Sequence, residues 1–183
     1  KNEIKELSKN WEKIIKSNNK YNISAFIYLI EEKKFAQINS NKILPAGSTI
    51  RLPIFFILLQ MHDNKEILWN EPLMINQASL TENSFSKVTA KSNKILPLYT
   101  LANRMISFND NNATNILIKR IGGIEEFNNK IELLGLKSTN LKTFLPDLNG
   151  SNVSTAKDLV KLMSLTISNE ILSLKSIDLF IDA

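Results

Sequence analysis

Residues 50–61 are the most apolar helix-like stretch of the chain, and they constrain the fold more than any other segment. Apolar residues recur there at helical spacing and also cover the remaining faces: Ile50, Ile54, Phe55, Phe56, Ile57, Leu58, Leu59 and Met61. A helix that is apolar all round is buried, so the sequence predicts a helix at the centre of the protein. Ser48 or Thr49 fits its N-cap, and Pro53 lies early enough to be tolerated. Arg51 follows Ser48 by about one turn and lies on the same side.

The composition is that of one globular domain, residues 1–183. The chain has 183 residues, of which 43% are hydrophobic and 22% charged, and this is enough for one core. No Pro-, Gly- or Ser-rich linker and no internal repeat divides it. The net charge of +5 comes from lysines scattered among Glu and Asp, so we expect no nucleic-acid partner. No apolar run is long enough to span a membrane.

The cysteine and histidine content limits the kinds of catalytic and metal-binding site that the chain can form. The chain has no cysteine, which excludes disulfides, thiolate metal sites and a cysteine nucleophile. The single histidine, His62, precedes a polar turn at the end of the core helix, a place typical of a surface residue rather than a catalytic one. One histidine without neighbouring carboxylates is a poor metal site, so we expect neither a metal nor a cofactor.

The rest of the chain predicts a mixed α+β fold. An amphipathic helix over residues 2–16 precedes a hairpin of two strands within 21–30 and 35–39. Residues 81–94 are polar and predict a surface excursion. Further helices are predicted after a Thr100 cap, up to Gly122, from Ile124 to Gly135, from a Thr155 cap, and over 173–181. Residues 141–153 are too rich in turn residues for a regular element.

Three motifs occur in order: Ser48-x-x-Arg51 entering the core helix, Asn109-Asp110-Asn111 between two helices, and Leu145-Pro146-Asp147-Leu148-Asn149 in the long loop. Their order and flanking residues resemble the class A serine β-lactamases and their penicillin-recognising relatives, which carry S-x-x-K, S-D-N and K-T-G motifs. The resemblance covers nearly the whole chain. It implies a helical lobe packed on an antiparallel sheet, and a serine that forms an acyl-enzyme with a β-lactam.

The same resemblance identifies the candidate site residues. Ser48 matches the nucleophile, and the candidate catalytic residues are Ser48, Arg51, Asn109 and Asn111. Asp147 and Asn149, in the long loop, are the candidate substrate-binding residues. The ligand that the resemblance implies is a β-lactam or a peptidoglycan-like peptide. It also implies an exported protein that acts at the cell envelope, in the periplasm or outside the cell.

Three positions depart from the family pattern. Arg51 replaces the lysine, and a guanidinium stays protonated, so it supplies charge but not a base. Asn109 replaces the first serine of S-D-N, and an amide is not a proton shuttle. Leu145 matches the loop glutamate that activates the deacylating water. We therefore expect weak or no β-lactam hydrolysis, as in a pseudoenzyme that keeps its nucleophile.

No K-T-G or K-S-G triplet occurs in the chain, so we expect these residues to lack the strands that bear the motif in the family. A sheet of two strands is too small to cover the core helix, so we expect an incomplete sheet. The expectation that follows is a partner chain, or strand exchange in a domain-swapped dimer, that supplies the missing edge.

Other interpretations remain open at this point. The scaffold is compatible with a non-catalytic binding or structural module in which Ser48 is only a helix cap. An active enzyme would need Asp110 or Asp147 as its base. Asp110 and Asn111 also fit a role in holding the turn between two helices, and Asn149 fits a tie between the long loop and the body.

Overall fold

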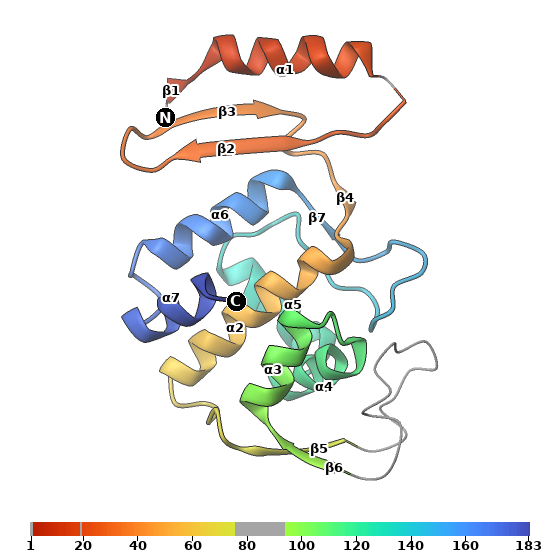
Figure 1. Ribbon diagram of the computed structural model, residues 1–183, viewed down its shortest axis with the longest axis vertical. Helices are drawn as coiled ribbons and strands as arrows, with labels where there is room; N and C mark the ends of the chain where they lie inside the picture. Colours follow the sequence, from red (N-terminus) through yellow and green to blue (C-terminus); the bar gives the residue numbers. More distant parts are fainter. Residues whose placement is uncertain (1, 19, 76–93) are drawn as a thin grey trace.

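The computed structural model describes residues 2–18, 20–75 and 94–183 (Figure 1). A small sheet with one helix above it lies at one end of the molecule, and a larger helical lobe makes up the rest (Figure 1). The predicted α+β class is confirmed: the described residues form seven α-helices and three small sheets. None of the described helices has the length and apolar character needed to cross a bilayer.

The predicted hairpin is the core of the first sheet. Strands β2 (Ala25–Leu29) and β3 (Lys34–Ile38) pair antiparallel, with Ile27 opposite Ala36. Strand β1 (Asn2–Glu3) adds to β3 in parallel, which gives the order β1-β3-β2. Helix α1 (Lys5–Ser17) packs on β3, and α6 (Ala156–Ile167) lies across the other face against β2 (Figure 1).

The predicted core helix is confirmed as α2 (Arg51–Asp63), which runs through the centre of the helical lobe (Figure 1). Ile54, Phe56 and Leu58 on different faces of α2 are 0% exposed, as expected for a helix that is apolar all round. The helices that contact α2 are α3 (Leu98–Ser107), α4 (Asn111–Ile121), α5 (Gly123–Leu133), α6 and α7 (Leu174–Ile181). Burial of this one helix therefore organises the lobe.

Two predicted helix caps are wrong. Residues Gly47–Ile50 form the short 3₁₀ helix η1, which continues directly into α2, so neither Ser48 nor Thr49 caps α2. The Thr49 hydroxyl instead donates to the carbonyl of Ala46, at 2.6 Å. Thr100 lies inside α3, which begins at Leu98 with Pro97 at its N-cap. The start of α2 is supplied by a preceding 3₁₀ turn and that of α3 by the end of strand β6 at Pro97 (Lys94–Pro97), and the local pattern of hydroxyl residues reveals neither.

Other helix ends follow their sequence cues. Gly122 ends α4 with a positive φ of 122°, and the Thr155 hydroxyl caps α6 by accepting from the Asp158 amide at 3.0 Å. Ser173 caps α7 and is itself bound by Asp63 at the end of α2. Burial acts to raise the pKa of Asp63, but hydrogen bonds from Ser173 and Ser176 outweigh it and hold that pKa below its usual value.

Two further strand pairs were not predicted. Strands β5 (Pro72–Ile75) and β6 (Lys94–Pro97) pair antiparallel at the far end of the lobe, and β4 (Leu44–Pro45) pairs with β7 (Val153–Ser154). The β4–β7 pair joins the segment before η1 to the end of the long loop. Of the predicted polar excursion, residues 81–93 lie outside the described residues, and Lys94 belongs to β6.

Candidate active site

Ser48 lies in η1, at the entrance to the core helix. Its side chain is exposed, and its hydroxyl forms no hydrogen bond with the described residues. Its carbonyl oxygen accepts the backbone N–H of Arg51, so the serine and the arginine are held one turn apart. This geometry leaves the hydroxyl of Ser48 accessible to a ligand.

Arg51 is buried, with 5% of its surface exposed, and its guanidinium is bound on three sides. Nη2 donates to Asn111 Oδ1 at 2.6 Å and to the carbonyl of Asn109 at 3.1 Å, and Nε donates to Thr114 Oγ1 at 3.2 Å. Burial lowers the pKa of Arg51, and the Asp110 carboxylate acts in the opposite direction. A guanidinium keeps its proton even so, and Arg51 is therefore a fixed positive charge that orients the turn.

Asn109, Asp110 and Asn111 form the turn between α3 and α4. Asn109 is exposed and has a φ of 52°, a left-handed conformation that asparagine adopts more readily than most residues. The Asn111 amide oxygen accepts from Arg51, whereas its nitrogen is bound by none of the described residues. The turn thus presents amide groups on the side that faces Arg51.

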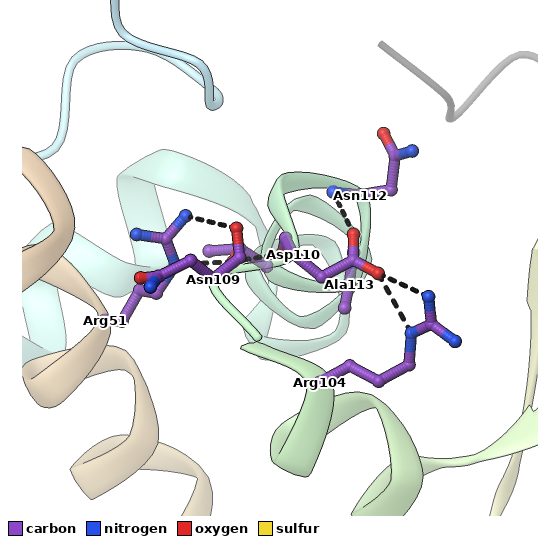
Figure 2. Close-up of polar contacts among 7 residues, drawn as sticks. Arg51, Arg104, Asn109, Asp110, Asn112 and Ala113 are labelled. Atoms are coloured by element: carbon purple, nitrogen blue, oxygen red, sulfur yellow. Dashed lines mark hydrogen bonds and ion pairs between the residues drawn. The ribbon is translucent and has the colours of Figure 1, made fainter. Parts of the chain in front are cut away.

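Asp110 has a structural role in this turn. One carboxylate oxygen, Oδ1, accepts the backbone N–H groups of Asn112 (2.9 Å) and Ala113 (3.2 Å), which caps α4. The other oxygen, Oδ2, accepts from Arg104, and the side chain is 0% exposed (Figure 2). A carboxylate engaged in this way favours the turn-holding interpretation over the catalytic base.

The long loop is tied to α4 at Leu145. The Asn115 amide donates to the Leu145 carbonyl at 2.6 Å and accepts the Leu145 N–H at 2.8 Å. The leucine side chain is 5% exposed, so it fills the space beneath the loop with an apolar group. Residue 145 therefore carries an apolar side chain that cannot accept a proton from water.

The Asp147 carboxylate forms hydrogen bonds within the long loop. Its carboxylate accepts the Ser151 N–H (3.0 Å), the Ser151 hydroxyl (2.9 Å) and the Asn152 N–H (2.6 Å). Burial acts to raise the pKa of Asp147, but these hydrogen bonds prevail and lower it. Asn149 is exposed, and among the described residues its side chain makes no tie to the body. The Asn152 side chain closes the loop on itself through Lys142 and Thr143. Its backbone carbonyl accepts the Ala46 N–H at 2.7 Å, and this bond ties the loop to the segment before η1.

The structure therefore brings four of the six predicted residues together and leaves two apart. Arg51, Asn109 and Asn111 share one hydrogen-bond network, and Ser48 adjoins it through the backbone of Arg51. Asp147 and Asn149 have no contact with this network among the hydrogen bonds of the described residues, so substrate binding by them stays a prediction.

Sequence reasoning missed Arg104, Thr114 and Asn115. Thr114 bridges Arg51 and the Asp110 carbonyl, to which it donates at 2.7 Å. Thr114 and Asn115 are polar residues in a run of α4 that is otherwise apolar and buried, and buried polar groups require partners. This pattern in the sequence was therefore the available sign that Thr114 and Asn115 bind other segments. Arg104 gave none, because an arginine in the last turn of a helix is usual on a surface.

Comparison with known sequences identifies related proteins. The sequence model of the Beta-lactamase enzyme family matches residues 6–183. Beta-lactamase BRO-1 of Moraxella catarrhalis is 29% identical over 171 residues, which cover 91% of this chain and 52% of that protein. Beta-lactamase ROB-1 of Haemophilus influenzae is 29% identical over 128 residues, or 69% of this chain and 38% of that protein. The chain thus spans about half the length of these curated relatives, or less.

Comparison with solved structures agrees with this family match. A leucine-to-glutamate variant of PBP-A, solved as an acyl-enzyme complex with penicillin G, superposes with a TM-score of 0.91 and 25% identity, covering 96% of this chain and 67% of that one. An ancestral class A β-lactamase, GNCA, superposes with a TM-score of 0.82 over 96% of this chain and 69% of its own, and at 17% identity it shows the fold alone. The family model covers nearly the whole chain and the fold is that of the class A enzymes, so this chain belongs to the Beta-lactamase enzyme family.

Proposed function

We propose that this protein is a serine penicillin-binding domain in which Ser48 is acylated by a β-lactam and keeps the acyl group. The observation that carries the proposal is the exposed, unbonded Ser48 hydroxyl one turn before a buried arginine that is bound to Asn111. In this reaction Ser48 Oγ attacks the lactam carbonyl, the ring C–N bond breaks, and the nitrogen takes up a proton. The positive charge of Arg51 favours negative charge developing near the serine.

Slow release of the acyl group follows from Leu145. Hydrolysis of the ester needs a general base to activate water, and loss of such a base typically lowers a rate by about 10²- to 10⁴-fold. Leu145 has no proton acceptor, and the Asp147 carboxylate is occupied by Ser151 and Asn152. Acylation is also slow in this proposal, because Arg51 cannot accept the serine proton.

The ligand proposed in the cell is a peptidoglycan-like peptide, with β-lactams acting as reactive mimics of it. Both are encountered in the cell envelope, and we propose that the protein is exported there. A non-catalytic binding module on the same scaffold is the second candidate. The observation that favours it is that Arg51 and Leu145 are both 5% exposed and are both held by α4, at Thr114 and Asn115. Neither residue can transfer a proton.

Labelling with a fluorescent penicillin separates the two candidates. We expect the wild-type protein to acquire covalent fluorescence on a denaturing gel, because the acyl-Ser48 ester survives denaturation. The matched control Ser48→Ala should acquire none, although it keeps the fold, since Ser48 is exposed and its side chain forms no hydrogen bond with the described residues. Equal absence of label from both proteins, even with excess probe, would support the non-catalytic module instead.

The edge of β2 supports a further proposal, that a partner chain adds strands to the sheet. Within the described residues β2 is an edge strand, paired only with β3. Ile27 and Leu29 are 41% and 37% exposed, and Ile30, which follows the strand, is 46% exposed. An exposed apolar edge is a template for strand addition. A second copy of the chain is one such partner, through strand exchange.

Light scattering coupled to size exclusion tests this assembly. We expect a dimer or larger species whose dissociation increases when Ile27→Lys places a charge on the β2 edge strand. The matched control is Asn10→Lys on the exposed side of α1, which adds the same single positive charge away from the edge strand. A stable, well-folded monomer at every concentration would contradict the partner proposal.

A further inference from the structure

We propose that Arg104 is a positioning residue of the Ser48 site, which it reaches through the buried carboxylate of Asp110. Nε and Nη2 of Arg104 each lie 2.9 Å from Asp110 Oδ2, so the guanidinium holds that oxygen with a two-pronged contact. The Arg104 carbonyl also accepts the Asp110 N–H, at 3.1 Å. Side chain and backbone of one residue in α3 therefore fix the same residue of the turn.

The turn is held from two sides by two arginines. Figure 2 shows Arg51, from α2, and Arg104, from α3, on opposite sides of the segment that carries Asn109 and Asp110. Arg51 binds the Asn109 carbonyl and the Asn111 amide oxygen, and Arg104 binds the residue between them. Each of three consecutive residues is thus bound by an arginine. Among the contacts of the described residues, the whole side-chain amide of Asn109 and the amide nitrogen of Asn111 remain for a ligand.

The burial of Asp110 explains why the arginine matters. Its side chain is 0% exposed, whereas that of Arg104 is 17% exposed. Oδ1 is already used to cap α4, so without Arg104 the charge on Oδ2 would lose its guanidinium partner inside the protein. A buried carboxylate in that state moves toward water. Such a movement would carry Asn109 and Asn111 with it, because they are its neighbours in the turn.

The path from Arg104 to the nucleophile is short. Asn111 binds the Arg51 guanidinium, and the Arg51 N–H donates to the Ser48 carbonyl. A displaced turn therefore changes both the amides that would contact a ligand and the charge beside Ser48. Misplacement of such groups by about 1 Å can lower a rate by about 10²-fold. The effect on acylation rests on the proposed function, whereas the effect on the turn does not.

The test uses the full chain and two readouts. Arg104→Gln removes the charge, and Arg104→Lys keeps the charge but loses the two-pronged contact. The matched control is Arg120→Gln, which breaks the ion pair of Arg120 with Glu71. Hydrogen–deuterium exchange measures the backbone amides of Asn112 and Ala113, which Asp110 caps, in the protein without ligand. Stopped-flow fluorescence with a labelled penicillin measures the acylation rate constant and the dissociation constant of the preceding complex.

We expect Arg104→Gln to raise exchange at the two capped amides by tenfold or more and to slow acylation by about tenfold to 10²-fold. Arg104→Lys should recover part of both changes, and Arg120→Gln should alter neither. The slowing should largely vanish in an Asn111→Ala background, since the arginine acts through the turn. Circular dichroism is used first to check that each variant is folded. If Arg104→Gln is unfolded, Arg104→Lys is compared with the wild-type protein in the same two measurements.

Two results would overturn the positioning role. One is exchange at Asn112 and Ala113 that stays unchanged when Arg104 is replaced. The other is slowing of acylation that is equally large in the presence and absence of the Asn111 side chain. If the wild-type protein takes no acyl group at all, the proposed function fails, and the exchange measurement alone then decides whether Arg104 positions the turn.

Discussion

Replacing Leu145 with glutamate is expected to speed release of the acyl group from Ser48 by about 10²- to 10⁴-fold. The substitution places a carboxylate where the loop now holds an apolar side chain, so that a water molecule can be activated. The loop keeps its anchor, because both hydrogen bonds from Asn115 go to the backbone of residue 145. Because residue 145 is 5% exposed, the variant buries a carboxylate, and this should lower its free energy of unfolding.

Steady-state turnover of a chromogenic cephalosporin measures this effect, because release limits turnover in the proposed scheme. Leu145→Gln is the matched control: it has the size and polarity of glutamate but no base, and its turnover should stay at the wild-type level. Equal turnover of the two variants would show that the missing carboxylate is not what retains the acyl group. Thermal unfolding of both variants separates this result from a loss of folded protein.

Replacing Arg51 with lysine is expected to raise the rate of acylation by about 10²-fold or more. A lysine can lose its proton when it is buried beside other polar groups, whereas the guanidinium cannot. The cost is structural, because one ammonium cannot reproduce the separate contacts of Arg51 with Thr114, Asn109 and Asn111. We therefore expect a less stable but more reactive protein.

The pH profile of acylation distinguishes this mechanism from a general loosening of the site. In Arg51→Lys the rate should rise with pH as the new amine loses its proton, and the wild-type profile should lack that step. Arg51→Gln is the control that keeps hydrogen-bonding groups without charge or base, and it should acylate no faster than the wild type. A rate increase of equal size in both variants would mean that space, not a base, limits acylation.

Periodicity predicted the parts of the fold in which burial dominates. The core helix was evident because its residues are apolar on every face, and the ends of α4 and α6 were evident from Gly122 and Thr155. The starts of α2 and α3 were not, since a preceding 3₁₀ turn and Pro97 take the place of a hydroxyl cap. The β5–β6 pair was missed because its strands are only four residues long.

Only those site residues that lie in the sequence motifs could be predicted. Their order identified Ser48, Arg51, Asn109 and Asn111, and the structure joins the last three in one hydrogen-bond network that Ser48 adjoins through the backbone of Arg51. It could not reveal that Asn115 holds Leu145, which lies 30 residues away in the chain. Nor could it reveal that Arg104 neutralises a carboxylate with no exposed surface. Such contacts depend on which segments the fold brings side by side, and spacing in the sequence does not record that.

Intact-mass spectrometry over time tests the central claim, that Ser48 is acylated and holds the acyl group. The protein is mixed with excess penicillin G, the free drug is removed, and the mass is followed, with peptide mapping to locate the adduct. We predict one penicillin adduct on Ser48 that outlasts the time of its formation many times over. A protein that gains no adduct, that gains it elsewhere than Ser48, or that loses it as fast as it forms would contradict the account.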